Sequence, residues 1–588
     1  MKKYYFYSAK CLILQAFMAF TVLLYAQAAP AETFYMPDAC SSLQNCFALM
    51  SGGDELIIRD GTYTGTSNVI DDQHRPPSGI SIATMTIVRA ENPGAVIFDG
   101  QHTRSLFYVN ANNSGNLNYI KFQGIVWRNT ATEGAVSIFG RADSYNEYIW
   151  FSQCGVADAG VNQPTSSNGL YMRYVNHALI EDCYAWGELY YGLSLLQCSN
   201  SIIRRGVVRY DVHRGDRGGG VSTYSSSNIE IQNCIVIDSD QQNAYSGITE
   251  MLYAYAFPTT NGPSTGVHVR GAFALNFNAP NLVAGLISQN GGGSGFTFDD
   301  FIVYDVSGGF WGRITDTVYS NSVFANTGGE RIGEGLVDFE GGGAVYDSLV
   351  FGNTSRGTNV PTSQYNFYYS NGTDGSSDVS NSYGVNPGTN GYLYLPRIEA
   401  ESILATAGQS SGRVGPEAIY QIGGTGTFYG DPGYNTASET ELWPFPNENT
   451  IKAFFAAYQG NSNATVSGDR GFASTTAKQL DGTSDVTLTS YIWEYLGNKM
   501  PPEIYGDSEN GACGSTHGSS SVDAPASNLC TSGTASSVTD SGASWTWTCA
   551  GTNGGSTANC SATEIDPEEN KSTNILLFLP SLLGGRQQ

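Results

Sequence analysis

The sequence is poor in charged residues, and positive charge is the scarcer kind. Charged residues make up 14% of the 588 residues, and 28 Lys and Arg stand against 53 Asp and Glu, which gives a formal net charge of −25. Between residues 56 and 400 the only lysine is Lys121. Because so acidic a chain repels phosphates, we exclude nucleic acid as a partner.

Most of the strong catalytic and metal-binding motifs are also missing. The sequence contains no GxSxG, HExxH, P-loop or EF-hand motif, and its cysteines form no CxxC pair. These absences argue against a serine hydrolase elbow, a zincin, a P-loop enzyme and a zinc ribbon. A function must therefore be sought in the organisation of the chain and in the distribution of its few cations.

The N-terminus is typical of a cleaved bacterial signal peptide, which we place at residues 1–31. Three lysines precede an apolar run over residues 11–25, and two small-x-small sites follow it. The alternative is a membrane anchor, but this run is short for a bilayer. We expect a secreted protein, extracellular or at the bacterial cell surface, with no transmembrane segment after cleavage.

Short alternating strands recur through the middle of the chain at the spacing of a solenoid. A small residue marks one register of the repeat, 23 to 30 residues apart, at Gly124, Cys154, Cys183, Gly206 and Cys234. Polar residues mark the bends, at Asn129, Asp158, Asp211, Asp238, Asp305, Asn326 and Asn353. No helical periodicity separates the strands, so the repeats predict an all-β parallel β-helix with Asn and Asp ladders at its turns.

The opening of the rod carries a family resemblance. Residues 52–63 read GGDELIIRDGTY, and residues 43–50 before them suit a capping helix. The string resembles the first coil of right-handed parallel β-helix proteins of the pectate-lyase-like superfamily. The resemblance covers about residues 33–400 and implies a right-handed rod with an N-terminal cap; we place this rod at residues 32–400. The superfamily holds lyases, hydrolases, epimerases and adhesins, so the fold alone selects no function.

Three further segments follow the rod. Residues 401–508 form an aromatic-rich extension that we expect to pack against the end of the rod, the alternative being a platform on which sugars stack. Residues 509–563 form a small disulfide-stapled β module that resembles a short bacterial extracellular repeat. Residues 564–588 are an acidic linker and a short apolar tail, too short to span a bilayer.

Ten cysteines remain after signal cleavage, and secretion allows them to form disulfides. Cys40 and Cys46 are close enough to pair. The four cysteines of the module permit three pairings, of which we favour the nested one, Cys513–Cys560 with Cys530–Cys549. The cysteines in the rod are expected to be buried free thiols, although adjacent coils leave a Cys154–Cys183 bridge open.

Positive charge gathers at one place in the rod. Residues 118–220 hold nine Lys and Arg and nine Asp and Glu, whereas residues 221–400 hold five and sixteen. Arg204 and Arg205 lie one coil above Glu181 and Asp182, which predicts either an ion-pair ladder or a functional cluster. The glycine-rich turn that follows contains His213, Arg214, Asp216 and Arg217 and is either solvated or a binding site.

A lyase-like site is the functional interpretation of this turn. Removing a proton next to a uronate carboxylate needs a base and a cation, and the resemblance implies Arg or Lys in these roles, with calcium. We assign Arg214 or Arg217 as base or carboxylate clamp and His213 as proton carrier. Further substrate contacts are assigned to Lys121, Arg209, Tyr210 and Asp216.

Two pairs of neighbouring acids are candidate calcium ligands through their oxygens. They are Glu181 with Asp182 and Asp299 with Asp300; the alternative is a ladder of bend residues. Two functions follow from the sequence. One is a secreted protein that binds, and by lyase chemistry cleaves, an extracellular polysaccharide. The other is a non-catalytic cell-surface or matrix protein in which the rod is a spacer.

Overall fold

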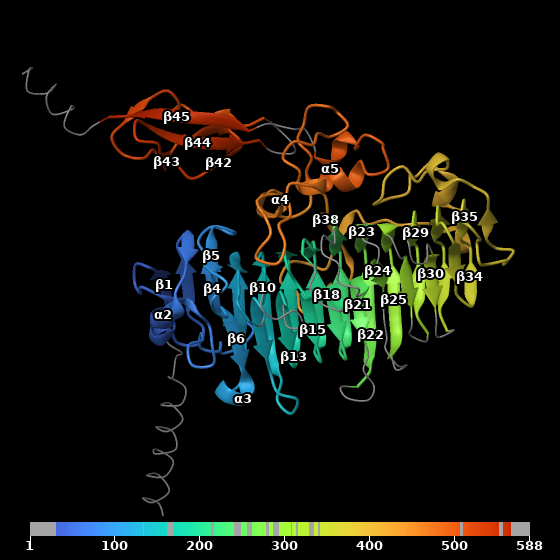
Figure 1. Cartoon of the computed structure of the whole chain (residues 1–588), viewed down its shortest axis with the longest axis horizontal. Helices are drawn as coiled ribbons and strands as arrows, with labels where there is room; N and C mark the ends of the chain where they lie inside the picture. The colour runs from blue at the N-terminus through green and yellow to red at the C-terminus, as the bar shows by residue number, and fades with distance from the viewer. Residues whose placement is uncertain are drawn as a thin grey trace, which may run out of the picture.

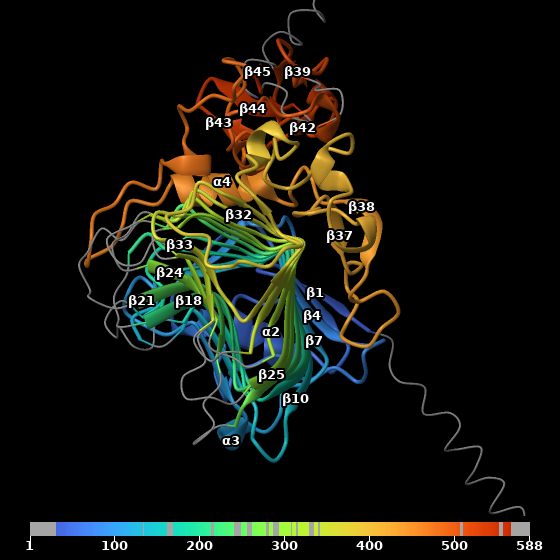
Figure 2. The ribbon, with the colours of Figure 1, turned by 90° about the vertical axis from the view of Figure 1, so that its right-hand side faces the viewer.

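The protein is a rod of three long parallel sheets with an extension laid along its side. The computed structural model describes residues 31–132, 134–160, 168–212, 217–239, 248–255, 262–277, 282–285, 293–306, 309–312, 316–328, 334–338, 342–505, 510–551 and 557–565. Viewed along the rod, the three sheets form the sides of a triangle (Figure 2). Successive strands of each coil belong to sheets A, B and C in turn, and each coil stacks on the one before it, which is the path of a parallel β-helix.

Sheet A holds β1 Thr33–Met36, β2 Glu55–Ile58, β4 Thr86–Ala90, β7 Ile120–Gln123, β10 Asn146–Ser152, β13 Val175–Glu181, β16 Ser199–Arg204, β19 Ser227–Gln232, β22 Ser264–Arg270, β25 Gly293–Asp299, β28 Val318–Ser320, β31 Ala344–Tyr346 and β34 Thr362–Gln364. Sheet B holds β3 Gly61–Tyr63, β5 Val96–Asp99, β8 Ile125–Arg128, β11 Gly155–Ala157, β14 Tyr184–Trp186, β17 Val207–Val208, β20 Ile235–Ile237, β23 Phe273–Phe277, β26 Ile302–Val306, β29 Val323–Ala325, β32 Leu349–Phe351, β35 Phe367–Tyr369 and β36 Ser382–Tyr383. Sheet C holds β6 Phe107–Asn110, β9 Val136–Phe139, β12 Leu170–Arg173, β15 Tyr191–Leu196, β18 Arg217–Tyr224, β21 Ile248–Tyr255, β24 Leu282–Gly285, β27 Phe310–Gly312, β30 Glu334–Asp338 and β33 Arg356–Asn359.

The core is a set of stacks in which equivalent residues of successive coils meet. Strand alternation points every second side chain inward, so Phe122 of β7 and Phe151 of β10 lie in register. Their rings stack with centroids 4.9 Å apart. The small-residue register is inward as well, with Cys154, Cys183 and Cys234 buried. The described cysteines of the rod are free thiols, as predicted.

The polar bend residues lie where the chain leaves sheet B. Five of the seven predicted positions have left-handed backbone, namely Asn129, Asp158, Asp238, Asp305 and Asn326. Asn and Asp tolerate this conformation because their side chains bond to nearby backbone groups. The same residues form inter-coil bonds, such as the 3.1 Å bond from Asn326 Nδ2 to Asp305 Oδ1. The predicted ladder therefore shapes this edge of the rod.

A short helix closes the N-terminal end, as predicted (Figure 1). It is α2, Leu43–Leu49, and Ser42 caps it by accepting a hydrogen bond from the Asn45 amide. Leu43, Cys46 and Phe47 are buried in the rod's core, and the predicted Cys40–Cys46 disulfide fixes the helix. The remaining short helices are α3 Ala111–Ser114 and 3-10 turns at Thr66–Asn68, Pro387–Thr389, Ile403–Ala405, Gln409–Ser411, Gly471–Ala473 and Pro502–Ile504.

The extension runs back along the sides of the rod, whereas the sequence suggested that it would pack at the end (Figures 1 and 2). It contains the hairpin β37 Tyr420–Ile422 and β38 Ala437–Glu441, and the helices α4 Glu448–Ala456 and α5 Leu488–Trp493. Trp443, Phe455 and Trp493 pack against sheet B, and Phe428 packs on Leu179 and Ile202 of sheet A. The extension packs there because both sheets carry large hydrophobic side chains on their outer faces, and the extension shields these side chains from water. Neither cluster includes a described residue of sheet C.

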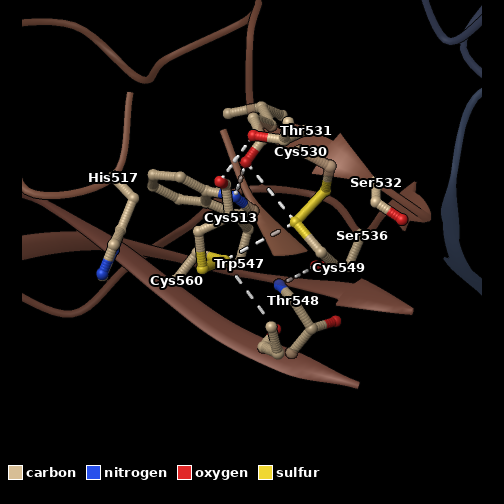
Figure 3. The surroundings of a disulfide bond; sticks show 12 residues. Cys513, His517, Cys530, Thr531, Ser532, Ser536, Trp547, Thr548, Cys549 and Cys560 are labelled. Carbon is tan, nitrogen blue, oxygen red and sulfur yellow. Dashed lines mark hydrogen bonds between the residues drawn. A yellow bond between two sulfur atoms is a disulfide. The ribbon is translucent and has the colours of Figure 1, made fainter. Parts of the chain in front are cut away.

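The small C-terminal module is held by two nested disulfides, Cys513–Cys560 and Cys530–Cys549 (Figure 3). This is the pairing that we favoured among the three. The buried Trp547 donates from Nε1 to the Leu529 carbonyl at 2.8 Å. The strands of the module are β39 Ala512–Cys513, β40 Ser520–Ser521, β41 Cys530–Ser532, β42 Thr534–Ala535, β43 Thr539–Asp540, β44 Ser544–Ala550 and β45 Ala558–Glu564. Within the described ranges, no helix is both long and apolar enough to cross a membrane.

Candidate functional site

The predicted basic turn leads into sheet C. His213, Arg214 and Asp216 lie outside the described residues. Arg217 is the first residue of β18, and its backbone pairs with Ile248 of β21. Of the predicted catalytic residues, the structure therefore describes only the backbone of Arg217, at the start of a strand of sheet C.

Two of the predicted substrate contacts, Arg209 and Tyr210, are buried. Arg209 is fully buried; its Nε lies 2.9 Å from Asp211 Oδ1, and its guanidinium donates to the carbonyls of Gly468 and Phe455. Burial lowers the pKa of Arg209, and Asp211 opposes that effect. Tyr210 is also buried, and its hydroxyl donates to the Tyr190 carbonyl at 3.2 Å. Arg209 therefore lies under the extension and binds it, whereas the side chain of Tyr210 belongs to the core of the rod.

The ladder interpretation of Glu181, Asp182, Arg204 and Arg205 is confirmed. Glu181 and Arg204 are in register on β13 and β16. Arg205 Nε lies 2.6 Å from Asp182 Oδ1, and its Nη2 lies 3.2 Å from Glu181 Oε2. Glu181 also accepts from the Gly426 amide at 3.0 Å, which ties the ladder to the extension. Protein donors thus serve both carboxylates.

The second pair of predicted calcium ligands is engaged in a similar way. Asp299 accepts from the Ser320 hydroxyl at 2.9 Å, and Asp300 accepts from the Glu417 amide at 2.9 Å and from Arg413. Burial, with the Asp299 charge next, raises the pKa of Asp300 to about 6, while Arg413 opposes the rise. Across the described parts of the chain, no group of three or more His, Cys, Asp or Glu side chains is arranged to hold a metal ion.

Lys121 lies on another side of the rod. It points outward from β7 in sheet A, and its Nζ is 3.7 Å from the centre of the Trp150 ring. Half-burial lowers its pKa, and Glu181 partly offsets this. Lys121 therefore lies on sheet A, whereas Arg217 begins a strand of sheet C.

The outer face of sheet C is the feature that the sequence analysis missed. Two outward rows run along it, one at Tyr108, Ser137, Tyr171, Ser194 and Ser222, the other at Asn110, Phe139, Arg173, Leu196 and Tyr224. The residues between them, such as Ile138 and Met172, point into the core and are fully buried. We call these two rows the sheet C face.

Aromatic rings line the first three coils of the sheet C face. The ring of Tyr108 lies 5.3 Å from that of Phe139, which lies 5.6 Å from that of Tyr171. All three side chains are partly exposed. They therefore offer a continuous aromatic strip that crosses from coil to coil along the axis of the rod.

A cation and hydroxyl groups stand beside this strip. Arg173 Nε donates to Gln197 Oε1 at 2.8 Å and its Nη2 donates to the Tyr174 hydroxyl at 3.2 Å. Among the described residues it has no carboxylate partner, in contrast to Arg204, Arg205 and Arg209. Burial raises the pKa of Tyr171, against the effect of Arg173, so this phenol stays protonated and able to donate at neutral pH.

The comparisons with known proteins agree with the fold. Residues 78–274 match a family model described as a right handed beta helix region. Together with the topology, this defines the fold as a right-handed parallel β-helix with an N-terminal cap, as the opening coil predicted. Comparison with curated proteins found no match.

Solved structures of similar fold include enzymes that are named for their action on polysaccharides. A mannuronic acid specific family 6 lyase from human gut microbiota is 13% identical over 61% of this chain and 92% of its own, with a TM-score of 0.40. A family 28 exopolygalacturonase of Yersinia enterocolitica is 14% identical over 60% and 78%, with a TM-score of 0.35. An α-1,3-glucanase of Streptomyces thermodiastaticus is 10% identical over 62% and 68%, with a TM-score of 0.37. No functional argument rests on likenesses of this size.

Proposed function

We propose that this is a secreted protein that binds an extracellular polysaccharide along the sheet C face and cleaves it by lyase-type chemistry. The observation that carries the proposal is the aromatic strip of Tyr108, Phe139 and Tyr171 beside Arg173, a cation with no carboxylate partner among the described residues. Of the three sheets, A and B are covered by the extension, and C is the one whose described residues stay out of its apolar clusters.

Binding follows from the chemistry of this face. Sugar rings pack their C–H faces on aromatic side chains, and a strip across three coils suits a polymer that lies along the rod. The planar fork of Arg173 suits a carboxylate, which it can hold through two parallel hydrogen bonds. Arg173 could therefore pair with a carboxylate of an acidic polysaccharide, although the chain as a whole is acidic.

Cleavage is assigned to the turn that leads into β18. In a lyase reaction a base removes the proton next to the uronate carboxylate, the released electron pair forms a carbon–carbon double bond, and the glycosidic oxygen leaves with a proton. We propose Arg214 or Arg217 as the base or carboxylate clamp and His213 as the proton carrier, with Asp216 at the same turn. No step is assigned to calcium, because the predicted ligands Glu181, Asp182, Asp299 and Asp300 already accept bonds from protein donors.

The test is a substrate screen of the secreted protein with and without calcium. Alginate, polygalacturonate, xylan and α-1,3-glucan are incubated with it, and absorbance at about 235 nm and new reducing ends are followed. A rise in both signals on a uronan supports the lyase. Reducing ends without absorbance would assign hydrolysis instead, and no binding to any polymer would remove the proposal.

A non-catalytic role is the second candidate. Its support is that the predicted calcium carboxylates are already paired with Arg205, Arg413 and backbone amides. The rod would then be a spacer at the cell surface or in the matrix, and the sheet C face would bind without turnover. Binding in the screen with neither signal is the outcome that selects this role.

A further inference from the structure

A cavity of about 620 Å³ lies on the extension, away from the sheet C face. It opens between the segment after the last coil and the segment around α5. Its lining residues are Leu393, Tyr394, Arg397, Glu399, Gln479, Asp481, Ser484, Glu494, Lys499, Met500, Pro501, Pro502 and Tyr505. A volume of this size is that of a small-molecule site, for which roughly 300 to 1,000 Å³ is usual.

The cavity has a fixed aromatic wall. The ring of Tyr394 packs 5.4 Å from that of the buried Trp493, and its hydroxyl donates to the Lys499 carbonyl at 3.1 Å. Met500 and the two prolines, Pro501 and Pro502, supply apolar surface next to it. This wall is held in place before any ligand arrives, which lowers the entropic cost of binding.

Several polar groups of the cavity are held as firmly. Arg397 lies 5.2 Å over the Trp493 ring, and its Nε is 3.2 Å from Glu399. Glu494 accepts from the Leu480 amide at 2.6 Å and from the Met500 amide at 3.2 Å. These bonds orient the side chains and still leave carboxylate lone pairs for a ligand.

The balance of charge indicates the class of ligand. Two cations, Arg397 and Lys499, and three anions, Glu399, Asp481 and Glu494, line the same space. An anion would meet the carboxylates and a cation would meet the guanidinium and the amine. The hydroxyl groups of a neutral ligand can bond to the cations and to the carboxylates, because each hydroxyl both donates and accepts hydrogen bonds.

We propose that this cavity binds a neutral sugar, one or two units long, with one ring face on Tyr394 and its hydroxyls bonded to Glu399, Glu494 and Lys499. The site is separate from the proposed function, because it takes an uncharged ligand and lies over sheet B, the side that Trp493 covers. It would hold a neutral side branch or chain end while the main chain lies elsewhere on the rod.

The experiment is titration calorimetry of the full mature chain with glucose, galactose, xylose, cellobiose and xylobiose, and with a uronate disaccharide as comparison. We expect millimolar or tighter binding of at least one neutral sugar. Tyr394→Ala is expected to abolish it, and Lys499→Ala to weaken it at least about fivefold. Lys478→Ala, which removes an exposed lysine outside the cavity, should bind as the parent does.

The sheet C variant Phe139→Ala/Tyr171→Ala is the control that separates the two proposals, and it should leave neutral sugar binding unchanged. Lys499 is exposed, so we expect Lys499→Ala to fold normally. It therefore tests the site even if Tyr394→Ala disturbs the packing of the extension. Absence of saturable binding, a preference for the uronate, or binding that Lys499→Ala and Tyr394→Ala leave intact would each overturn this inference.

Discussion

Tyr458 of the extension donates a 2.6 Å hydrogen bond to Asp158 at the bend ladder of the rod, 300 residues earlier in the chain. The same pattern recurs along the ladder: Tyr491 donates to Asp238 at 2.9 Å and Tyr495 to Asp305 at 2.8 Å. Asp158 and Asp238 are buried and Asp305 is partly buried, and each accepts a hydrogen bond from the extension. Rod and extension are therefore one folding unit, since unsatisfied buried carboxylates are costly.

Tyr458→Phe should destabilise the protein, because it leaves a buried carboxylate with one donor fewer. We expect a loss of about 1 to 3 kcal/mol in the free energy of unfolding, measured by urea denaturation. Tyr420→Phe is the matched control, since Tyr420 is 42% exposed, and it should change little. Equal effects of the two variants would mean that the Asp158 bond does not support the fold.

Asp158 should also make stability depend on pH. Burial raises its pKa from 3.8 to about 7, while Tyr458, the Glu188 amide and Asn461 oppose the rise. Because the folded pKa lies above the unfolded one, this group's contribution is complete below pH 3.8 and is lost as the pH rises through about 7. Asp158→Asn, which keeps an acceptor oxygen, should therefore gain melting temperature relative to the parent as the pH rises. Parallel melting curves from about pH 4 to pH 8 would contradict this assignment.

Arg205→Ala should be strongly destabilising, since it strands two acids. Arg205 is 1% exposed and pairs with both Glu181 and Asp182. Removing one partner of a buried ion cluster costs about 3 to 5 kcal/mol, to be measured by chemical denaturation. Arg141→Ala is the control, because Arg141 pairs with Asp143 on the open surface and should contribute little.

Arg214→Ala/Arg217→Ala tests the turn that leads into β18. We expect polysaccharide turnover and binding to be lost while melting temperature hardly changes, because a turn contributes little to a rod held by its core stacks. Joint loss of activity and fold would make the two arginines structural. Unchanged activity on an identified polymer would place the chemistry elsewhere.

The rod was predictable because its signals are local and repeated. The small-residue register and the bend residues recur at the spacing of a coil, and the string at residues 52–63 marks the first coil. The pairing of Arg205 with Asp182 followed from the same register. From the sequence the nested disulfides could be favoured, but the other pairings could not be excluded, because four cysteines allow three pairings.

Contacts between distant segments were beyond the same reasoning. In the sequence Arg209 is a cation close to a turn. In the structure its guanidinium donates to the carbonyl of Phe455, 246 residues later in the chain. The sheet C face was missed for a different reason. Equivalent positions on its strands, from Tyr108 to Ser222, are 29, 34, 23 and 28 residues apart, so only the strand register shows which side chains are neighbours.

The most direct test of the central claim is the affinity of the mature protein for polysaccharides before and after Phe139→Ala/Tyr171→Ala, measured by affinity electrophoresis in gels that contain alginate, polygalacturonate or xylan. The control is Tyr35→Ala/Tyr420→Ala, which removes two aromatic rings exposed elsewhere. We predict that at least one polymer retards the parent and the control equally and retards the sheet C variant at least about tenfold less, with melting temperatures alike. Equal retardation of the parent and the sheet C variant would show that the polysaccharide does not bind on the sheet C face.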